Sequence, residues 1–488
     1  MGLFALAACG PSRVSPPPAP VQPQPDLAEP DPLGQGVRVG LLLPLSGPAE
    51  ALGQDMLRAA EMALFDVGEN DIVLLPRDTA GSALEARGAA EEVIAEGADL
   101  ILGPLFSQAV GAVGPVAALA DVPVLAFSNV TAAADPPTTF VLGFRPEEQV
   151  HRVVDHALRQ GLVRIAGLAP DDAYGRTALA ALEEAVIANG GELGEVLFYP
   201  PDLADPSDVV RQIAAYGERR YALEQERARV AAEPDGEARL RELENLDTFG
   251  PPPFDAILIA DGGSRVRSVA ALLTFFDVSP EDVRFLGTMR WQDDPLVLEE
   301  DSLRGGWFAG PSPSRTAAFG ERFERAFGTP PQQLASLAYD ATALAVIVAR
   351  DLGDPAFSVE TLTGSQGFEG ATGLFRLRPE GIADHGLAVL EIQDGTTTAI
   401  DPAPSRFEDL IVTTTPPAGP PAGPGATEPG PGLPGGGVPG LDPLPGAEGA
   451  PRLRPEPAPL ERVIVPQRAP PPATSPPGPE EVVPDASF

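Results

Sequence analysis

The apolar residues of this chain alternate between short continuous runs and longer stretches in which they recur every three or four positions. Residues 37–45 (VRVGLLLPL) are a nearly continuous apolar run, typical of a strand buried on both faces, and a Ser46-Gly47-Pro48 turn follows it. Residues 54–65 come next and have helical spacing. The alternation continues with predicted strands at 72–76, 99–102 and 122–127 and predicted helices at 83–96 and 108–120. This order predicts a parallel sheet covered by helices on both faces, with any site at the carboxyl ends of its strands.

A second series of the same kind begins near residue 147 and predicts a second lobe of similar size. Its predicted helices are 147–159, 206–216 and 265–276, and its predicted strands are 164–168, 196–199, 255–260 and 283–287. Helices at 316–327 and 334–351 and strand-like runs at 373–377 and 387–392 then close the body near Ile400. We therefore predict an α/β protein of two lobes. The first lobe comprises 37–144 and 306–370, the second comprises 145–305, and closing strands occupy 371–401.

A charged segment, residues 217–250, interrupts the second lobe. Glu and Arg alternate in it at spacings of three and four, as in Arg220 and Glu224, and Leu240 and Leu243 mark an apolar side. This spacing favours a solvated helix or a helical hairpin. Two interpretations remain open, a passive surface insertion or an arm that docks on a partner.

Proline-rich segments flank the body, and the chain holds 59 prolines in all. Residues 10–36 have no periodic apolar pattern, so we predict an extended tether. Residues 402–488 are predicted to be disordered, apart from a short apolar and basic stretch at 460–468 that could dock elsewhere. No apolar run reaches 18 residues, so no membrane-spanning helix is predicted.

Charge and composition exclude several classes of function. The formal net charge is -37 and the sequence contains no Lys, so nucleic acids and anionic membrane surfaces are poor partners. Without an amine side chain there is no Walker A loop and no Schiff base. His151 and His156 lie five positions apart on a predicted helix and His385 is isolated, a poor pattern for a metal site. We therefore predict a binding protein without a cofactor rather than an enzyme.

The single cysteine, Cys9, follows Leu6-Ala7-Ala8. Small residues before a Cys at the end of an apolar stretch resemble the lipobox of bacterial lipoproteins, in which the thiol is acylated. Residues 1–8 are shorter than a full signal peptide, so we expect the rest of the signal upstream of Met1. The resemblance implies a lipid anchor at Cys9 and a periplasmic location. Gly10 in place of the Asp that retains lipoproteins in the inner membrane favours the outer membrane. A chance cysteine is the alternative.

Several motifs together resemble the type I periplasmic binding proteins, typified by the branched-chain amino-acid receptors. In order, the motifs are 37–48 followed by Gly53, Gly103-Pro104 with Ser107, Val122-Pro123-Val124-Leu125 before Ser128-Asn129, Asp172-x-Tyr174-Gly175, and Tyr339-Asp340-Ala341. Each motif is weak alone, but their order and spacing agree from Val37 to about Ile400. The resemblance implies the type I fold, in which two lobes close on a ligand.

In that family, hydroxyls and backbone N–H groups at helix N-termini hold the ligand's carboxylate, because unsatisfied N–H groups and the helix dipole favour an anion. The matching positions here are Ser46, Ser107, Ser128 and Thr131 in the first lobe, with Tyr174 across from them. From the residues alone, Ser107 and Ser128 could equally be helix N-caps, and Tyr174 could simply pack its ring.

The amino-acid receptors of this family place an acidic side chain after the strand that ends the second lobe's sheet, where it pairs with the ligand's ammonium. Here that position falls at Thr288-Met289, which offers no carboxylate. Asp261 is the nearest substitute, although it could be a turn residue ahead of Gly262-Gly263. A buried ammonium without a counter-charge is costly, so ordinary amino-acid binding is disfavoured.

The lipobox, the charged insertion and the proline-rich flanks resemble instead the lipoprotein branch of the family, the outer-membrane activators of penicillin-binding proteins. That resemblance implies a peptidoglycan synthase as the partner. The alternative hypothesis is the substrate-binding protein of an ABC importer for amino acids or a related small anionic ligand.

Overall fold

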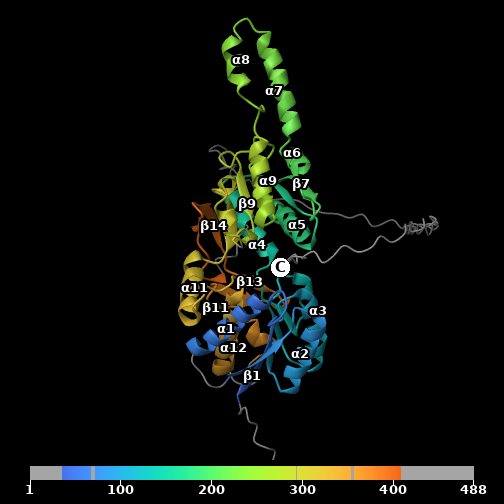
Figure 1. Cartoon of the computed structure of the whole chain (residues 1–488), viewed down its shortest axis with the longest axis vertical. Coiled ribbons are helices and arrows are strands. Elements are labelled where there is room, and N and C mark those ends of the chain that lie inside the picture. The colour runs from blue at the N-terminus through green and yellow to red at the C-terminus, as the bar shows by residue number, and fades with distance from the viewer. Residues whose placement is uncertain (1–35, 68–71, 293, 353–356, 408–488) are drawn as a thin grey trace, which may run out of the picture. The chain divides into compact units, whose positions relative to one another are not determined.

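The computed structural model describes residues 36–67, 72–292, 294–352 and 357–407. Cys9, the tether up to residue 35 and the tail beyond residue 407 lie outside the described residues. The described strands form sheets of five, seven and three strands. The two larger sheets are flanked by helices, so the α/β fold of two lobes predicted from the sequence is confirmed (Figure 1).

The first sheet is entirely parallel and has the strand order β2-β1-β3-β4-β5. Leu41 and Leu43 share a core with Met56, whereas Leu42 between them packs in a second core with Val93. The strand therefore buries side chains on both faces, as its continuous apolar run predicts. The strands are β1 (Val37–Leu43), β2 (Ile72–Asp78), β3 (Leu100–Leu102), β4 (Val124–Ala126) and β5 (Thr139–Val141), and the flanking helices are α1 (Glu50–Val67), α2 (Ala83–Ala95), α3 (Ser107–Leu119) and α12 (Ala335–Leu352).

The second sheet has the order β15-β14-β10-β9-β8-β6-β7, with five parallel strands and an antiparallel pair, β14 and β15, at one edge. Leu258 packs towards α4 and α5, and Ile257 and Ile259 pack towards α6 and α9. The strands are β6 (Arg164–Pro170), β7 (Glu192–Tyr199), β8 (Ala256–Ile259), β9 (Arg284–Gly287), β10 (Trp307–Gly310), β14 (Ala388–Gln393) and β15 (Thr396–Asp401), and the helices are α4 (Pro146–Arg159), α5 (Ala173–Ala188), α6 (Ser207–Ile213) and α9 (Gly263–Phe275).

A small antiparallel sheet, β11-β12-β13, lies between the return of the chain to the first lobe and the closing strands. The short or polar strands β11, β13 and β15 were not predicted. The remaining elements are β11 (Phe368–Glu369), β12 (Leu374–Leu377), β13 (Ala383–His385), α10 (Pro295–Leu298), α11 (Pro313–Phe327), α13 (Val359–Leu362) and the short helices η1 (Thr131–Ala133), η2 (Met289–Trp291) and η3 (Asp301–Leu303).

The boundary between the second lobe and the second part of the first lobe, predicted at residue 306, lies later in the chain. Trp307 pairs with Leu286 of β9 and with Glu391 of β14, so β10 belongs to the second sheet. The return to the first lobe therefore begins after Gly310 and not at 306. The apolar run at 307–310 carries no sign of which sheet it joins, since a buried strand has the same pattern in either.

Buried charges tie the connection between β5 and α4 to strand β13. The Arg145 guanidinium donates from Nε and Nη2 to the carbonyl of Ala383, at 3.2 and 3.1 Å. The Glu148 carboxylate accepts from the backbone N–H of Arg145 at 2.9 Å and from that of His385 at 3.1 Å. Arg145 also lies 3.6 Å from a carboxylate oxygen of Asp384. Two segments through which the chain passes between the sheets are thus held together by one network.

Helix α4 is also tied to the last strand by Asp401. Its Oδ2 lies 2.9 Å from Arg152 Nη1, 3.0 Å from Arg159 Nη2 and 3.0 Å from His156 Nδ1. Burial by itself would raise the pKa of Asp401, but the hydrogen bond and charge of Arg152, with hydrogen bonds from Arg159 and His156, lower that pKa to about 2. The carboxylate is therefore stabilised in its charged form.

We predict that this carboxylate makes the protein sensitive to acid. Because the folded-state pKa of Asp401 lies below the usual value, its contribution of about 2 kcal/mol is present above pH 4 and is lost as the pH falls towards 2. Asp401→Asn should lower the free energy of unfolding at pH 7 and flatten its pH dependence between pH 4 and 2, as measured by urea unfolding. An unchanged acid profile in the variant would contradict the assignment.

Candidate functional site

The Ser46 loop follows β1 at the carboxyl edge of the first sheet. Its donors are turned to Asp78, at the end of β2: the backbone N–H groups of Leu45 and Ser46 lie 2.8 and 3.2 Å from Oδ1 of Asp78. Burial opposes ionisation of Asp78, but hydrogen bonds from the Ser46 hydroxyl and from backbone N–H groups outweigh it and lower the pKa of Asp78. An internal carboxylate thus already occupies the donors that the family resemblance assigns to the ligand.

Ser107 and Ser128 follow the next two strands, β3 and β4. Ser107 is the first residue of α3 and Phe106 is the N-cap, so Ser107 does not cap the helix. Ser128 is buried, and its hydroxyl accepts the backbone N–H of Val130 at 3.2 Å. Ser128 therefore fixes the turn that leads into η1.

Thr131 opens η1 and donates its hydroxyl to Oε1 of Glu147 at 2.8 Å. Glu147 lies in the first turn of α4, which begins the second lobe. The second carboxylate oxygen of Glu147, Oε2, is buried and has no hydrogen-bond partner among the described residues. A negatively charged group with one unsatisfied oxygen therefore stands beside the predicted first-lobe site.

Tyr174 is the second residue of α5, at the carboxyl edge of the second sheet. Its hydroxyl donates to Oγ1 of Thr288 at 2.9 Å, and Thr288 is fully buried directly after β9. The guanidinium of Arg290 lies over the Tyr174 ring, 4.4 Å from its centroid. Nη1 of Arg290 is buried without a hydrogen-bond partner in the region that the structure describes.

Asp261 follows β8 and is 1% exposed. Its carboxylate accepts from Nε of Arg265 at 2.8 Å, from the N–H of Gly262 at 2.8 Å and from the Tyr199 hydroxyl. Burial, together with the charge of Asp261, raises the pKa of Tyr199, so the phenol remains a donor. Asp261 thus already has a cation and two further donors, and it offers no free charge to a ligand.

The predicted residues fall into two groups. Ser46, Ser107 and Ser128 follow β1, β3 and β4 of the first sheet, and Tyr174 and Asp261 follow β6 and β8 of the second. The N–H of Met289, next to Thr288, donates to Gln149 of α4 at 2.9 Å, so the segment after β9 contacts the start of α4. Sequence reasoning missed Glu147 and Arg290. Arg290 lies two residues after Thr288, whereas Glu147 lies 16 residues after Thr131, and nothing in the sequence marks either as unpaired.

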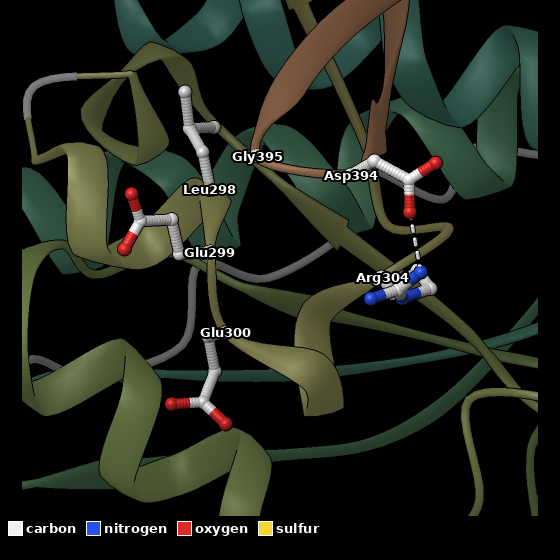
Figure 2. A pocket seen from close by; sticks show the side chains of 6 residues that line it. All are labelled: Leu298, Glu299, Glu300, Arg304, Asp394 and Gly395. Atoms are coloured by element: carbon white, nitrogen blue, oxygen red, sulfur yellow. Dashed lines mark hydrogen bonds and ion pairs between the residues drawn. The ribbon is translucent and has the colours of Figure 1, made fainter.

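A separate pocket of about 410 Å³ lies on the second lobe and is lined by Leu298, Glu299, Glu300, Arg304, Asp394 and Gly395 (Figure 2). Arg304 there pairs with Asp394 and, at 3.0 Å, with Asp301. None of the predicted site residues lines this pocket. Among the described residues there is no cluster of three or more His, Cys, Asp or Glu side chains suited to a metal ion, and no helix long and apolar enough to cross a membrane.

The charged insertion forms two helices, α7 (Tyr216–Ala231) and α8 (Glu237–Glu244), as predicted. Figure 1 shows this helical arm extending away from α9 and from the strands of the second sheet. The arm has a small core of its own, made by Leu223, Val230 and Leu243. Tyr221 on its surface is 63% exposed.

Arg219 fixes the base of the arm. Its buried guanidinium donates to the carbonyls of Gly250, Phe276 and Asp277 at 3.2, 3.4 and 2.9 Å. The Thr248 hydroxyl donates to the carboxylate of Asp277. Several hydrogen bonds therefore hold the base of the arm against the loop after α9.

The protein family described as "periplasmic binding protein" matches residues 36–397, most of the chain. The chain belongs to this family. A curated relative, an uncharacterized protein of Rickettsia prowazekii (strain Madrid E), is 24% identical over 178 residues, which are 36% of this chain and 47% of the relative. The chain thus spans about half the length of the curated relative that it matches.

Solved structures agree with the family assignment. An ABC transporter substrate-binding protein from Sphaerobacter thermophilus has a TM-score of 0.57 at 21% identity and covers 76% of this chain and 97% of its own. A leucine binding protein from Thermotoga maritima MSB8 has a TM-score of 0.51 at 18% identity, covering 74% and 97%. A solute-binding protein of an ABC transporter from Rhodopseudomonas palustris BisB5, solved with 3,4-dihydroxybenzoic acid, has a TM-score of 0.52 at 19% identity, covering 77% and 99%. At these identities the likeness establishes the fold.

Proposed function

We propose that this periplasmic binding protein is a penicillin-binding protein activator, anchored to the outer membrane through Cys9, that binds and stimulates a peptidoglycan synthase. The observation that carries the proposal is the helical arm α7–α8. It contributes no predicted ligand-binding residue, yet it has its own core and a base fixed by Arg219. A protein that only binds a solute between its lobes has no need of such an arm.

The surface of the arm suits a protein partner. Tyr221 is exposed, and Arg220 beside it lies 5.8 Å from the ring centroid of Tyr216. Tyrosine and arginine are the side chains that dominate binding energy in protein interfaces. Ion pairs such as Arg229 with Glu226, at 2.7 Å, already order the helix surface, so docking would cost little side-chain entropy.

In-cell crosslinking of the full lipoprotein tests the partner. A photoreactive amino acid at Tyr221 should capture a penicillin-binding protein, because this side chain lies on the arm. The matched control is a photoreactive amino acid at Leu119, which is 93% exposed on α3 of the first lobe and should not capture the synthase. Capture of permease subunits from position 221, or equal capture of the synthase from both positions, would contradict the proposal.

We further predict that the arm can be removed without unfolding the body. Replacing residues 220–247 by a short Gly/Ser linker retains Arg219 and Thr248, which hold the base of the arm. The melting temperature of the body should change little, because the core of the arm is separate from the larger cores. Stimulation of glycan polymerisation by the purified synthase should be lost. Full stimulation by this variant would show that the arm is not the docking surface.

A second candidate is the substrate-binding protein of an ABC importer. The observation in its favour is the set of polar residues at the carboxyl edges of both sheets, together with solved relatives that are described as ABC transporter proteins. One of these relatives was solved with an aromatic acid that has no ammonium. Under this hypothesis, crosslinking would recover permease subunits and not a synthase.

A further inference from the structure

The base of the arm carries a contiguous group of aromatic rings and arginines. The ring centroid of Phe276 lies 5.1 Å from that of Tyr216 and 5.2 Å from that of Phe275. The guanidinium of Arg211 lies 5.4 Å from the Phe276 centroid, and that of Arg220 lies 5.8 Å from the Tyr216 centroid. We call these five residues the arm-base patch. They come from α6, α7 and the end of α9, and α6 contacts both other helices (Figure 1).

Phe275 is the exposed apolar residue of the arm-base patch. It is 73% exposed, whereas Phe276 beside it is buried in the core of the second lobe. A single exposed apolar residue, such as Phe65 on α1, needs no explanation. Phe275 differs because it continues a row of rings flanked by two arginines. Aromatic side chains and arginine are enriched in protein interfaces and dominate their binding energy.

The two arginines of the patch carry charge at the surface. Arg211 lies 3.7 Å from Asp208, but the two side chains are 55% and 96% exposed, so this ion pair contributes little. Arg220 is exposed, and its contact with the Tyr216 ring limits the motion of its side chain. Both guanidinium groups can therefore be approached by a partner.

Other acids near the patch are paired or lie at its border. Asp277 accepts from the Thr248 hydroxyl and lies 3.4 Å from Arg219, so its charge is engaged at the base of the arm. On α7, Glu218 projects from a different side than the patch, because residues two apart on a helix do not share a face, and Glu224 lies one turn beyond the patch. The patch is thus a positive area on a chain whose formal net charge is -37, and it is complementary to carboxylates.

The backbone fixes the position of the patch. Ala215, the N-cap of α7, has left-handed dihedrals of φ +46° and ψ +36°. L-residues avoid this conformation, and it persists only where surrounding contacts enforce it. The hydrogen bonds of Arg219 to the carbonyls of Gly250 and Asp277 are contacts of this kind. Docking on the patch therefore requires little ordering of the backbone.

We propose that the arm-base patch binds an acidic segment of the synthase, with carboxylates at Arg211 and Arg220 and an apolar side chain against Phe275. This inference rests on the proposed function. It extends the docking surface from the arm onto α6 and α9 of the second lobe, and it states the chemical class of the segment that docks.

The test measures binding of the purified full lipoprotein to an immobilised peptidoglycan synthase by surface plasmon resonance. Phe275→Ser should weaken the affinity about 30-fold, as expected for a residue that carries much of the binding energy. Arg211→Gln combined with Arg220→Gln should slow association and make it less sensitive to added salt, because two attracting charges are lost. All three side chains are exposed, so the melting temperature should change little.

The matched controls lie on the first lobe. Phe65→Ser removes a phenylalanine that is 88% exposed on α1, and Arg87→Gln removes an exposed arginine of α2. Both controls should bind the synthase normally. The same variants are tested on vesicles of phosphatidylethanolamine and phosphatidylglycerol, because an anionic membrane is the other surface that attracts arginine and phenylalanine.

Weaker synthase binding by the patch variants, with normal binding by both controls, supports the inference. If the unchanged protein binds no synthase, the proposed function and the inference both fall. If replacement of residues 220–247 abolishes binding but Phe275→Ser and the double arginine variant bind normally, the inference alone falls. It also falls if the patch variants lose binding to the vesicles and keep binding to the synthase.

Discussion

Replacing Arg145 by Met is expected to lower the free energy of unfolding by about 3–5 kcal/mol, because it breaks a buried ion-pair network. Only 9% of the Arg145 side chain is exposed. Its loss would leave the carbonyl of Ala383 without either guanidinium donor and the Glu148 carboxylate without its nearest buried cation. The measurement is urea unfolding followed by circular dichroism.

The matched control is Arg87→Met on α2. Arg87 pairs with Glu91 at 3.0 Å, but both side chains are more than half exposed, and such pairs contribute less than about 1 kcal/mol. If Arg145→Met costs no more than Arg87→Met, the network between α4 and β13 does not stabilise the fold as argued. The two arginines differ mainly in burial. Each lies near a glutamate of the same helix, since Arg145 is the N-cap of α4 and Arg87 lies within α2.

Gly175→Ala is expected to destabilise the protein by about 3 kcal/mol or more, because there is no space for the added methyl group. A Cβ at Gly175 would lie 2.0 Å from the carbonyl oxygen of Pro170 and 3.0 Å from the Cβ of Ala169. Pro170 ends β6, so relief of the clash requires α5 to move away from the strand, and Tyr174 would move with it. Thermal unfolding should show a large fall in melting temperature.

Gly88→Ala is the opposite case in the same fold. Gly88 lies inside α2, and no atom of the described residues lies within 4 Å of its Cβ position. Alanine should therefore stabilise the helix by about 0.5–1 kcal/mol through its better helix propensity. If Gly88→Ala also lowered the free energy of unfolding, the space around each glycine would not explain the effect of Gly175→Ala.

The sequence predicted the elements that bury both of their faces or a regular stripe. The apolar run at 37–43 is typical of a buried strand, and the spacing of Met56 and Ala60 places them on one face of a helix. The paired charges of 217–250 likewise predicted helices, since spacings of three and four bring side chains together on a helix surface. Strands that pair with a distant partner and have no apolar run, such as β13 and β15, gave no such pattern.

Part of the candidate site was also accessible from the sequence. The family resemblance, and not the spacing alone, assigned Ser46, Ser107, Ser128 and Tyr174 to the site, with Asp261 as the nearest substitute acid. These residues follow strands of the two sheets, and residues after parallel strands lie at the carboxyl edge of the sheet. Their environments were not accessible, because a hydrogen bond between Tyr174 and Thr288 joins positions 114 residues apart.

The sequence by itself determined the fold class, the order of the two lobes and the existence of the charged helical insertion, because these depend on local periodicity. Only the tertiary structure decided which charges are satisfied. Asp261, the predicted substitute for a ligand-binding acid, is paired with Arg265, whereas Glu147 and Arg290 have buried atoms that find no partner within the described part of the chain. Whether a charge has a partner depends on contacts between distant segments and on burial, and neither is encoded in the spacing of residues along the chain.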